Sequence, residues 1–189
     1  MREASEKQTV LLDACTLLNL YATSCLEEIL AGLEHRFGVV EYVMRSEALF
    51  IERPDHVPPD REQVDVGALV ERGLVEIVEI ASESEAELFL QLATELDDGE
   101  ARTLAIAASR GWSVATDDRK AQRVAARECP QVTLFTSLEL LKEWVDANGI
   151  DAARIGELLL NIRDRANFIP GKHDPMVFWW RSLSGPGQD

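Results

Sequence analysis

Residues 112–135, WSVATDDRKAQRVAARECPQVTLF, hold the pattern that decides the fold. Residues 112–116 and residues 132–135 each predict a short buried strand. Residues 119–127, which lie between them, have the length and residue types of a helix. Two strands joined through a helix run parallel, so this stretch predicts a parallel sheet covered by helices.

The same alternation continues outward along the chain. Residues 9–12 form a brief apolar run ending at Asp13, which is typical of a strand buried on both faces, and residues 74–80 predict another strand. Residues 43–51 predict a helix, which Pro54 and the prolines after it break. The predicted fold is a three-layer α/β/α sandwich around a central parallel sheet.

Capping signals mark where several helices should begin. A hydroxyl residue followed three positions later by glutamate is the pattern of a capping box. The chain has three such pairs: Ser24 with Glu27, Ser82 with Glu85, and Thr136 with Glu139. We expect Gly38 to end the first of these helices and Asn148-Gly149 to end the last.

The length of the chain favours one main domain. With 189 residues and 46% hydrophobic residues, it can bury one substantial core. We expect this domain to span residues 1–149, followed by a C-terminal helical and aromatic extension over residues 150–189. The aromatic cluster Phe178-Trp179-Trp180 in that extension either packs onto the domain or contacts a partner.

Composition excludes several classes of protein. A formal net charge of -15 argues against a protein that coats nucleic acid, because phosphate neutralisation needs clustered Lys and Arg. No apolar run approaches the roughly 18 residues of a membrane span, and the polar start is unlike a signal peptide, so we expect a cytoplasmic protein with no membrane association. Three scattered cysteines fit neither a disulfide framework nor a zinc site.

Acidic residues follow two of the predicted strands. Asp13 ends the first strand, and Asp117 and Asp118 end the strand at residues 112–116. Ligands of an open parallel sheet bind at the carboxyl ends of its strands, so these carboxylates are candidates for one shared site. The alternative is that each aspartate caps the following helix, although only one residue of the consecutive pair can take the capping position.

Two further carboxylates lie on predicted helices. Glu47 follows the spacing of Val43 and Ile51, which places it in line with residues facing the core, where a lone carboxylate is costly. Its alternative is the edge of that stripe, with the carboxylate in water. Glu100 begins a helix, and its alternative is a capping box with Asp97.

Carboxylates that converge from these elements would repel one another unless a cation neutralised them. All-oxygen ligation suits Mg²⁺ or Mn²⁺. A site of this kind can orient and deprotonate a water for attack on a phosphodiester, so the set predicts a nuclease. The basic residues Arg119, Lys120 and Arg123, followed by Arg127, come directly after the acidic pair and either contact substrate or form a solvated helix face.

Three stretches carry a family resemblance: VLLDACTLLNLYA (residues 10–22), VMRSEAL (residues 43–49) and LDDGEARTLAIAASRGWSVATDDRKAQRVA (residues 96–125). Over residues 9–145 the chain resembles the PIN-domain proteins, including VapC-like toxins. The resemblance implies a PIN-like nuclease domain that cleaves RNA with Mg²⁺ or Mn²⁺. It matches the acids to Asp13, Glu47, Glu100 and either Asp118 or Asp117, and Thr116 to the hydroxyl residue before the last acid, which we expect to contact substrate.

The expected partners are an RNA substrate, a second copy of the chain in a homodimer, and the antitoxin protein of a toxin–antitoxin pair. Against the toxin role, the chain is longer than the compact toxins. The main alternative is a non-catalytic PIN-like protein-binding module that uses the C-terminal extension. A receiver domain lacks its mid-chain phosphoacceptor here, and a haloacid-dehalogenase-like phosphatase would need an acid where Cys15 stands.

Overall fold

A computed structural model of the chain describes residues 7–46, 49–53 and 60–184. Its central sheet has five parallel strands: β1 (Gln8–Leu12), β2 (His35–Val40), β5 (Glu76–Val78), β6 (Ser113–Ala115) and β7 (Leu134–Phe135). Their order is β5-β2-β1-β6-β7. In the central strand β1, Val10, Leu11 and Leu12 are fully buried, as expected for a strand covered on both faces.

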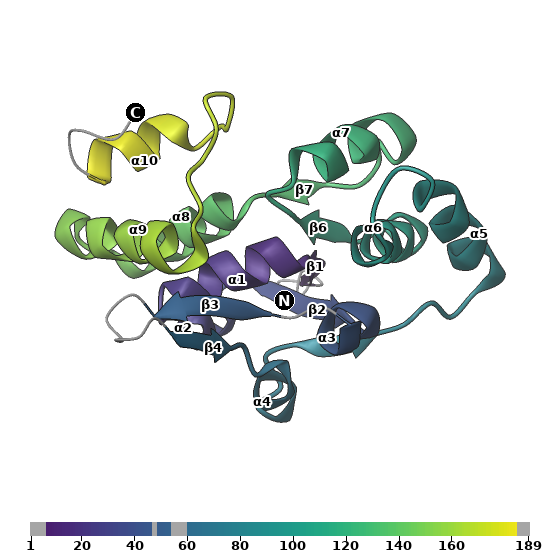
Figure 1. Cartoon of the computed structure of the whole chain (residues 1–189), viewed down its shortest axis with the longest axis horizontal. Helices are drawn as coiled ribbons and strands as arrows, with labels where there is room; N and C mark the ends of the chain where they lie inside the picture. Colours follow the sequence, from purple (N-terminus) through teal and green to yellow (C-terminus); the bar gives the residue numbers. More distant parts are fainter. Residues whose placement is uncertain (1–6, 47–48, 54–59, 185–189) are drawn as a thin grey trace, which may run out of the picture.

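Helices cover both faces of this sheet (Figure 1), which confirms the predicted three-layer α/β/α sandwich. One layer contains α1 (Ala14–Ala22), α2 (Leu26–Gly32) and α8 (Ser137–Asn148), and the other contains α5 (Glu83–Leu92), α6 (Asp98–Arg110) and α7 (Arg119–Glu128). The short helices α3 (Glu41–Ser46) and α4 (Val66–Glu71) lie near one edge. Within the described ranges, no helix is long and apolar enough to cross a membrane.

The strand order reverses between β1 and β6. From β1 the chain continues to β2 on one side, and it later returns to β6 on the other side. Leu12 lies beside Ala115 in the sheet, and the amide of Asp13 donates a hydrogen bond of 3.0 Å to the carbonyl oxygen of Ala115. Ligands of open α/β sheets bind at such a reversal, so the residues after β1 and β6 begin the candidate site.

The prediction of a helix over residues 43–51 is wrong in its second half. α3 ends at Ser46, and β3 (Phe50–Arg53) pairs with β4 (Asp60–Gln63) in an antiparallel hairpin. Ile51 is buried in that hairpin and not on a helix. Apolar spacing over so few residues fits both structures, and here tertiary pairing decides between them.

The predicted first capping box and helix end are also wrong. Ser24 has a positive φ of 62° and its hydroxyl accepts a hydrogen bond from Arg165, so Cys25 takes the N-cap position of α2 without a side-chain bond. Gly38 lies in β2, where a Cβ would come 2.8 Å from Cδ2 of Leu11. Gly38 therefore allows β2 to approach the side chain of Leu11 in β1 closely.

The capping predictions at Thr136 and Gly149 are confirmed, and the one at Ser82 is confirmed in part, because the Glu85 side chain accepts from the amide of Ala81 and not of Ser82. The hydroxyl of Ser82 accepts a hydrogen bond from the amide of Glu85 at the start of α5. Thr136 and Glu139 form a complete capping box that starts α8. Gly149 ends α8 in the left-handed conformation, with a φ of 61°.

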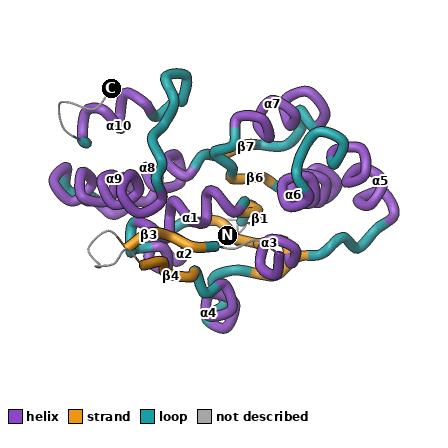
Figure 2. Tube along the Cα trace, viewed as in Figure 1, coloured by secondary structure: helices purple, strands orange, loops and turns teal. Residues whose placement is uncertain are grey.

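The C-terminal part of the chain packs against the sandwich. The helix α9 (Ala152–Ala166) lies over α1, and Leu158, Leu159 and Ile162 on its inner face are fully buried. A long loop then leads to α10 (Val177–Leu183), as Figure 2 shows. Trp180 of α10 is buried, and its ring meets Phe168 edge-on with 6.3 Å between centroids. The division into domains at residue 149 stays a prediction.

Candidate functional site

Asp13 is buried at the reversal point and has two roles there. Its Oδ1 accepts a hydrogen bond of 2.8 Å from the amide of Ala14 and so caps α1, while its Oδ2 accepts one of 2.8 Å from the hydroxyl of Thr116. Burial raises the pKa of Asp13 more than these hydrogen bonds lower it. The Asp13 carboxylate therefore caps α1 and also belongs to a group of carboxylates near the carboxyl ends of β1 and β6. This group, Asp13, Glu100 and Asp118, is the acidic end of the sheet.

Thr116 holds Asp13 in place and does not reach the surface. Its hydroxyl is buried, donates to Asp13 and accepts a hydrogen bond of 3.1 Å from the amide of Asp118. The substrate contact predicted for Thr116 stays a prediction. A side chain with both hydrogen-bonding functions occupied inside the protein has a positioning role.

The consecutive aspartates differ in their surroundings. Both oxygens of Asp117 are used inside the fold: Oδ2 accepts from Asn19 at 2.9 Å and Oδ1 accepts from the amide of Ser137, the first residue of α8, at 3.1 Å. Oδ1 of Asp118 caps α7, while its Oδ2 has no hydrogen-bond partner among the described residues. Asp118 is thus the member of the pair with a carboxylate oxygen available for a ligand.

Glu100 is both part of a capping box and one of the clustered carboxylates, the two alternatives that its sequence position allowed. It forms the capping box with Asp97 at the start of α6, where the amide of Asp97 donates to its Oε2 at 3.4 Å. Burial, followed by the negative charges of Asp97, Asp118 and Asp13, raises the pKa of Glu100 to about 7. Because these three charges act on Glu100, the carboxylates from β1, α6 and the end of β6 share one electrostatic environment.

Cys15 is a member of this site that the sequence patterns did not reveal. Its thiol donates to Oδ2 of Asp13 at 3.1 Å and accepts from the amide of Asp117 at 3.3 Å. Burial, together with Asp13 and Asp117, raises the pKa of Cys15 well above its ordinary value, so the group stays a thiol. Its place two residues after Asp13, in the first turn of a helix, was the available signal.

Glu47 lies outside the described residues. The helical spacing that singled it out does not hold in the structure, because α3 ends at Ser46 and Ile51 belongs to β3. Its candidacy now rests on the family resemblance alone.

The basic residues of α7 border a groove beside the acidic end. This groove, about 750 Å³ in volume, is lined by Asp117, Asp118, Arg119 and Arg123, together with residues of the loop between α9 and α10. Lys120 is exposed and does not line it. Arg127, at the far end of the same stripe, pairs with Glu95 at 2.5 Å and with Glu128 at 2.6 Å, so its charge is compensated on the surface.

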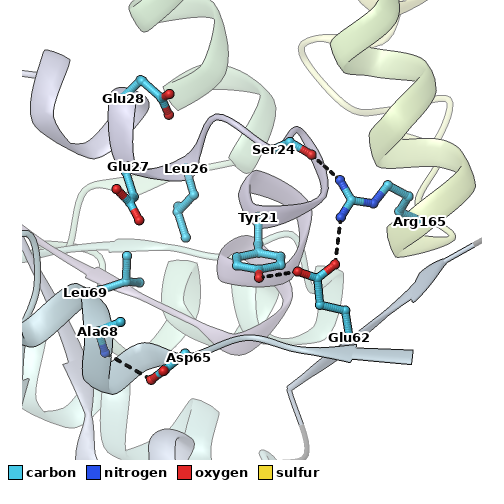
Figure 3. A pocket seen from close by; sticks show the side chains of 10 residues that line it. All are labelled: Tyr21, Ser24, Leu26, Glu27, Glu28, Glu62, Asp65, Ala68, Leu69 and Arg165. Carbon is cyan, nitrogen blue, oxygen red and sulfur yellow. Dashed lines mark hydrogen bonds and ion pairs between the residues drawn. The ribbon is translucent and has the colours of Figure 1, made fainter. Parts of the chain in front are cut away.

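A second pocket, of about 430 Å³, lies at the opposite end of α1 (Figure 3). Its central carboxylate, Glu62, accepts a hydrogen bond of 2.8 Å from Tyr21 and pairs with Arg165 at 3.2 Å and with Arg53 at 3.3 Å. The hydrogen bond from Tyr21 and the two arginines lower the pKa of Glu62. Burial and the neighbouring Glu62 raise the pKa of Tyr21 to about 12. The negative charge of Glu62 in this pocket is therefore balanced by Arg165 and Arg53.

The donor set at the acidic end suits a hard cation. Asp13, Glu100 and Asp118 supply only oxygen ligands, which Mg²⁺ and Mn²⁺ prefer. Burial and then the repulsion between neighbouring carboxylates raise the pKa of Glu100, and a divalent cation bound there would relieve both. In the part of the chain that the structure describes, no three acidic, histidine or cysteine side chains converge closely enough to hold an ion as they stand.

Comparison with known proteins identifies the family of this chain. A family model described as a PIN domain matches residues 9–172, which extends beyond the quoted motifs and through α9. A search of curated proteins found no match. PIN domains are generally nucleases and typically use divalent metals. Because this family model covers residues 9–172 of the 189 residues, the chain belongs to the PIN-domain family.

Proposed function

We propose that this protein is an endoribonuclease that cleaves RNA phosphodiester bonds with Mg²⁺ or Mn²⁺. The observation that carries the proposal is the group formed by the carboxylates of Asp13, Glu100 and Asp118 at the sheet reversal. There burial, followed by the negative charges of neighbouring aspartates, raises the pKa of Glu100 to about 7. Among the described residues, no arginine or lysine forms an ion pair with any of these three side chains. Burying like charges without a counter-charge costs stability, which a bound cation restores.

In this proposal Asp13, Glu100 and Asp118 hold the metal, with Glu47 as a further candidate from the family resemblance. A bound divalent cation would activate water and stabilise charge on the phosphoryl oxygens. Thr116 and Cys15 keep the Asp13 carboxylate in place through hydrogen bonds of 2.8 and 3.1 Å. Asp117 ties the end of β6 to α8 through Ser137 and to α1 through Asn19.

The toxin role belongs to this proposal as its finer form. With it go an antitoxin protein as partner and a homodimer as the assembled state, which stay predictions from the sequence. An adjacent gene for a small DNA-binding protein would support the toxin role, and its absence would favour RNA processing.

The decisive experiment is cleavage of RNA by the purified protein with Mn²⁺, with Mg²⁺ and with EDTA, compared with Asp13→Asn. We expect cutting that needs metal and that Asp13→Asn lowers by roughly 100-fold or more, because a metal ligand is lost. The matched control is Asp151→Asn. Asp151 also caps a helix, α9, and lies away from the acidic end, so an asparagine there keeps the cap and leaves cleavage unchanged.

Two outcomes contradict the proposal. If Asp13→Asn cuts as fast as the wild type, the acidic end is not the catalytic site. If neither protein cuts RNA although the wild type binds metal, the binding-module alternative replaces the nuclease.

A further inference from the structure

The groove beside the acidic end has walls from two distant parts of the chain. One wall is α7, which presents Arg119, Gln122 and Arg123. The other is part of the loop between α9 and α10, with Phe168, Ile169 and His173. Asp117 and Asp118 line the same groove, so it leads to the acidic end. Figure 1 shows this loop rising on the same side of the molecule as α7.

The two walls differ in chemistry. Arg119 and Arg123 are exposed and form no ion pair with any described residue, so both guanidinium groups are available for phosphates. On the facing loop, Ile169 is 60% exposed and lies next to the ring of Phe168 in the chain. The loop wall is apolar at Phe168 and Ile169 and polar at His173 and Asp174. Two arginines opposite the apolar part of the loop suit an unpaired nucleic-acid strand, with its backbone on one side and its bases on the other.

Gly171 leaves room for the guanidinium group of Arg119. A Cβ on Gly171 would lie 1.0 Å from Nη2 of Arg119 and 2.3 Å from its Cζ, so the guanidinium occupies the space that a side chain at this position would need. Asp174, three residues on, is near enough for the charge of Arg119 to act on its carboxylate. The guanidinium of Arg119 therefore lies against the backbone of the loop at Gly171, and Arg119 lines the groove.

We infer that the loop spanning residues 168–175 is one wall of the groove that binds the RNA strand, and that Gly171 is a positioning residue that seats the Arg119 guanidinium for a phosphate contact. This inference rests on the proposed function and adds the C-terminal loop to its substrate site.

The test is binding of a fluorescent single-stranded oligouridylate to the full-length chain in EDTA, where cleavage does not interfere. Salt is varied, because each phosphate contact to a single strand contributes about 0.7 to the slope of log affinity against log salt. The variants are Arg119→Ala, Gly171→Ala and the double variant. Gly171→Ala collides only with the end of a flexible side chain, so the guanidinium shifts while the thermal unfolding midpoint stays at the wild-type value.

We expect Arg119→Ala and Gly171→Ala each to weaken binding by about tenfold and to lower the salt slope, since one charge-assisted contact is lost. The double variant should bind no more weakly than Arg119→Ala, because both changes remove the same contact. Two controls should bind like the wild type. Arg36→Ala removes an exposed charge from β2, away from the groove, and Gly67→Ala adds a methyl group in α4.

Wild-type binding by Gly171→Ala, or weakening that adds to that of Arg119→Ala, overturns the inference. If that happens while the wild type cuts RNA with metal, the proposed function stands without the loop. If the predicted coupling appears but no RNA is cut, the groove stands as a binding site and the proposed cleavage fails. A wild type that neither binds nor cuts RNA overturns both.

Discussion

The two ends of α1 carry carboxylates in opposite electrostatic settings. At its start, Asp13 lies near Glu100 and Asp118, and the pKa of Glu100 is raised to about 7. At its other end, Glu62 lies between Arg165, Arg53 and Tyr21, and its pKa is lowered. The second group compensates its own charge and joins the hairpin to α1 and α9. The first group does not, and it is therefore the group at which we propose that a cation binds.

The largest effect is expected for the two consecutive aspartates after β6, where substitution of Asp118 should reduce cleavage and substitution of Asp117 should reduce stability. Asp118→Asn keeps the cap of α7 but removes a carboxylate charge, so we expect RNA cleavage to fall by roughly 100-fold with little change in stability. Asp117→Asn should mainly lower the free energy of unfolding, by about 1–3 kcal/mol, because an amide cannot accept from both Asn19 and Ser137. Cleavage rates and urea unfolding of both variants check this, and equal loss of cleavage without destabilisation in Asp117→Asn would contradict it.

A smaller effect should appear at the compensated end. Glu62→Gln leaves Arg165 and Arg53 without their shared carboxylate, so we expect the free energy of unfolding to fall by about 1–3 kcal/mol while metal-dependent cleavage continues. Glu28→Gln is the matched control, because Glu28 lines the same pocket and has no partner among the described residues. Loss of cleavage in Glu62→Gln at full stability would show that this pocket also serves the reaction.

The smallest effect is the pH dependence of stability without metal. A carboxyl whose pKa is raised on folding binds its proton more tightly in the folded state, so it removes stability as pH rises from 4.5 to about 7. Glu62 acts in the opposite sense, because its lowered pKa makes stability fall as pH drops below 4.5. Thermal unfolding in EDTA across this range should show both trends, and Glu100→Gln should flatten only the upper one. An unchanged upper trend in Glu100→Gln would remove Glu100 from the acidic group.

Part of the site follows from sequence alone. Asp13 and the pair Asp117-Asp118 were predicted at strand ends, and parallel strands bring their carboxyl ends to one edge of the sheet. The capping-box spacing of Asp97 and Glu100 was also correct. The helical stripe through Ile51 was not, because the pairing of β3 with β4 outweighs a local pattern. A sequence does not reveal that the Thr116 hydroxyl already has partners inside the fold, and its contact with substrate stays a prediction.

By itself the sequence determined the alternation of strands and helices, the parallel sheet and the edge where acids gather, because apolar periodicity and capping are local properties of the chain. Only the tertiary structure decided which acids are compensated. Asp117 meets Asn19 and Ser137, and Glu62 meets Arg165, across long stretches of sequence. It also brought Gly171 against Arg119. Such contacts depend on how layers pack, so the charge available for a ligand is set by neighbours that no local pattern encodes.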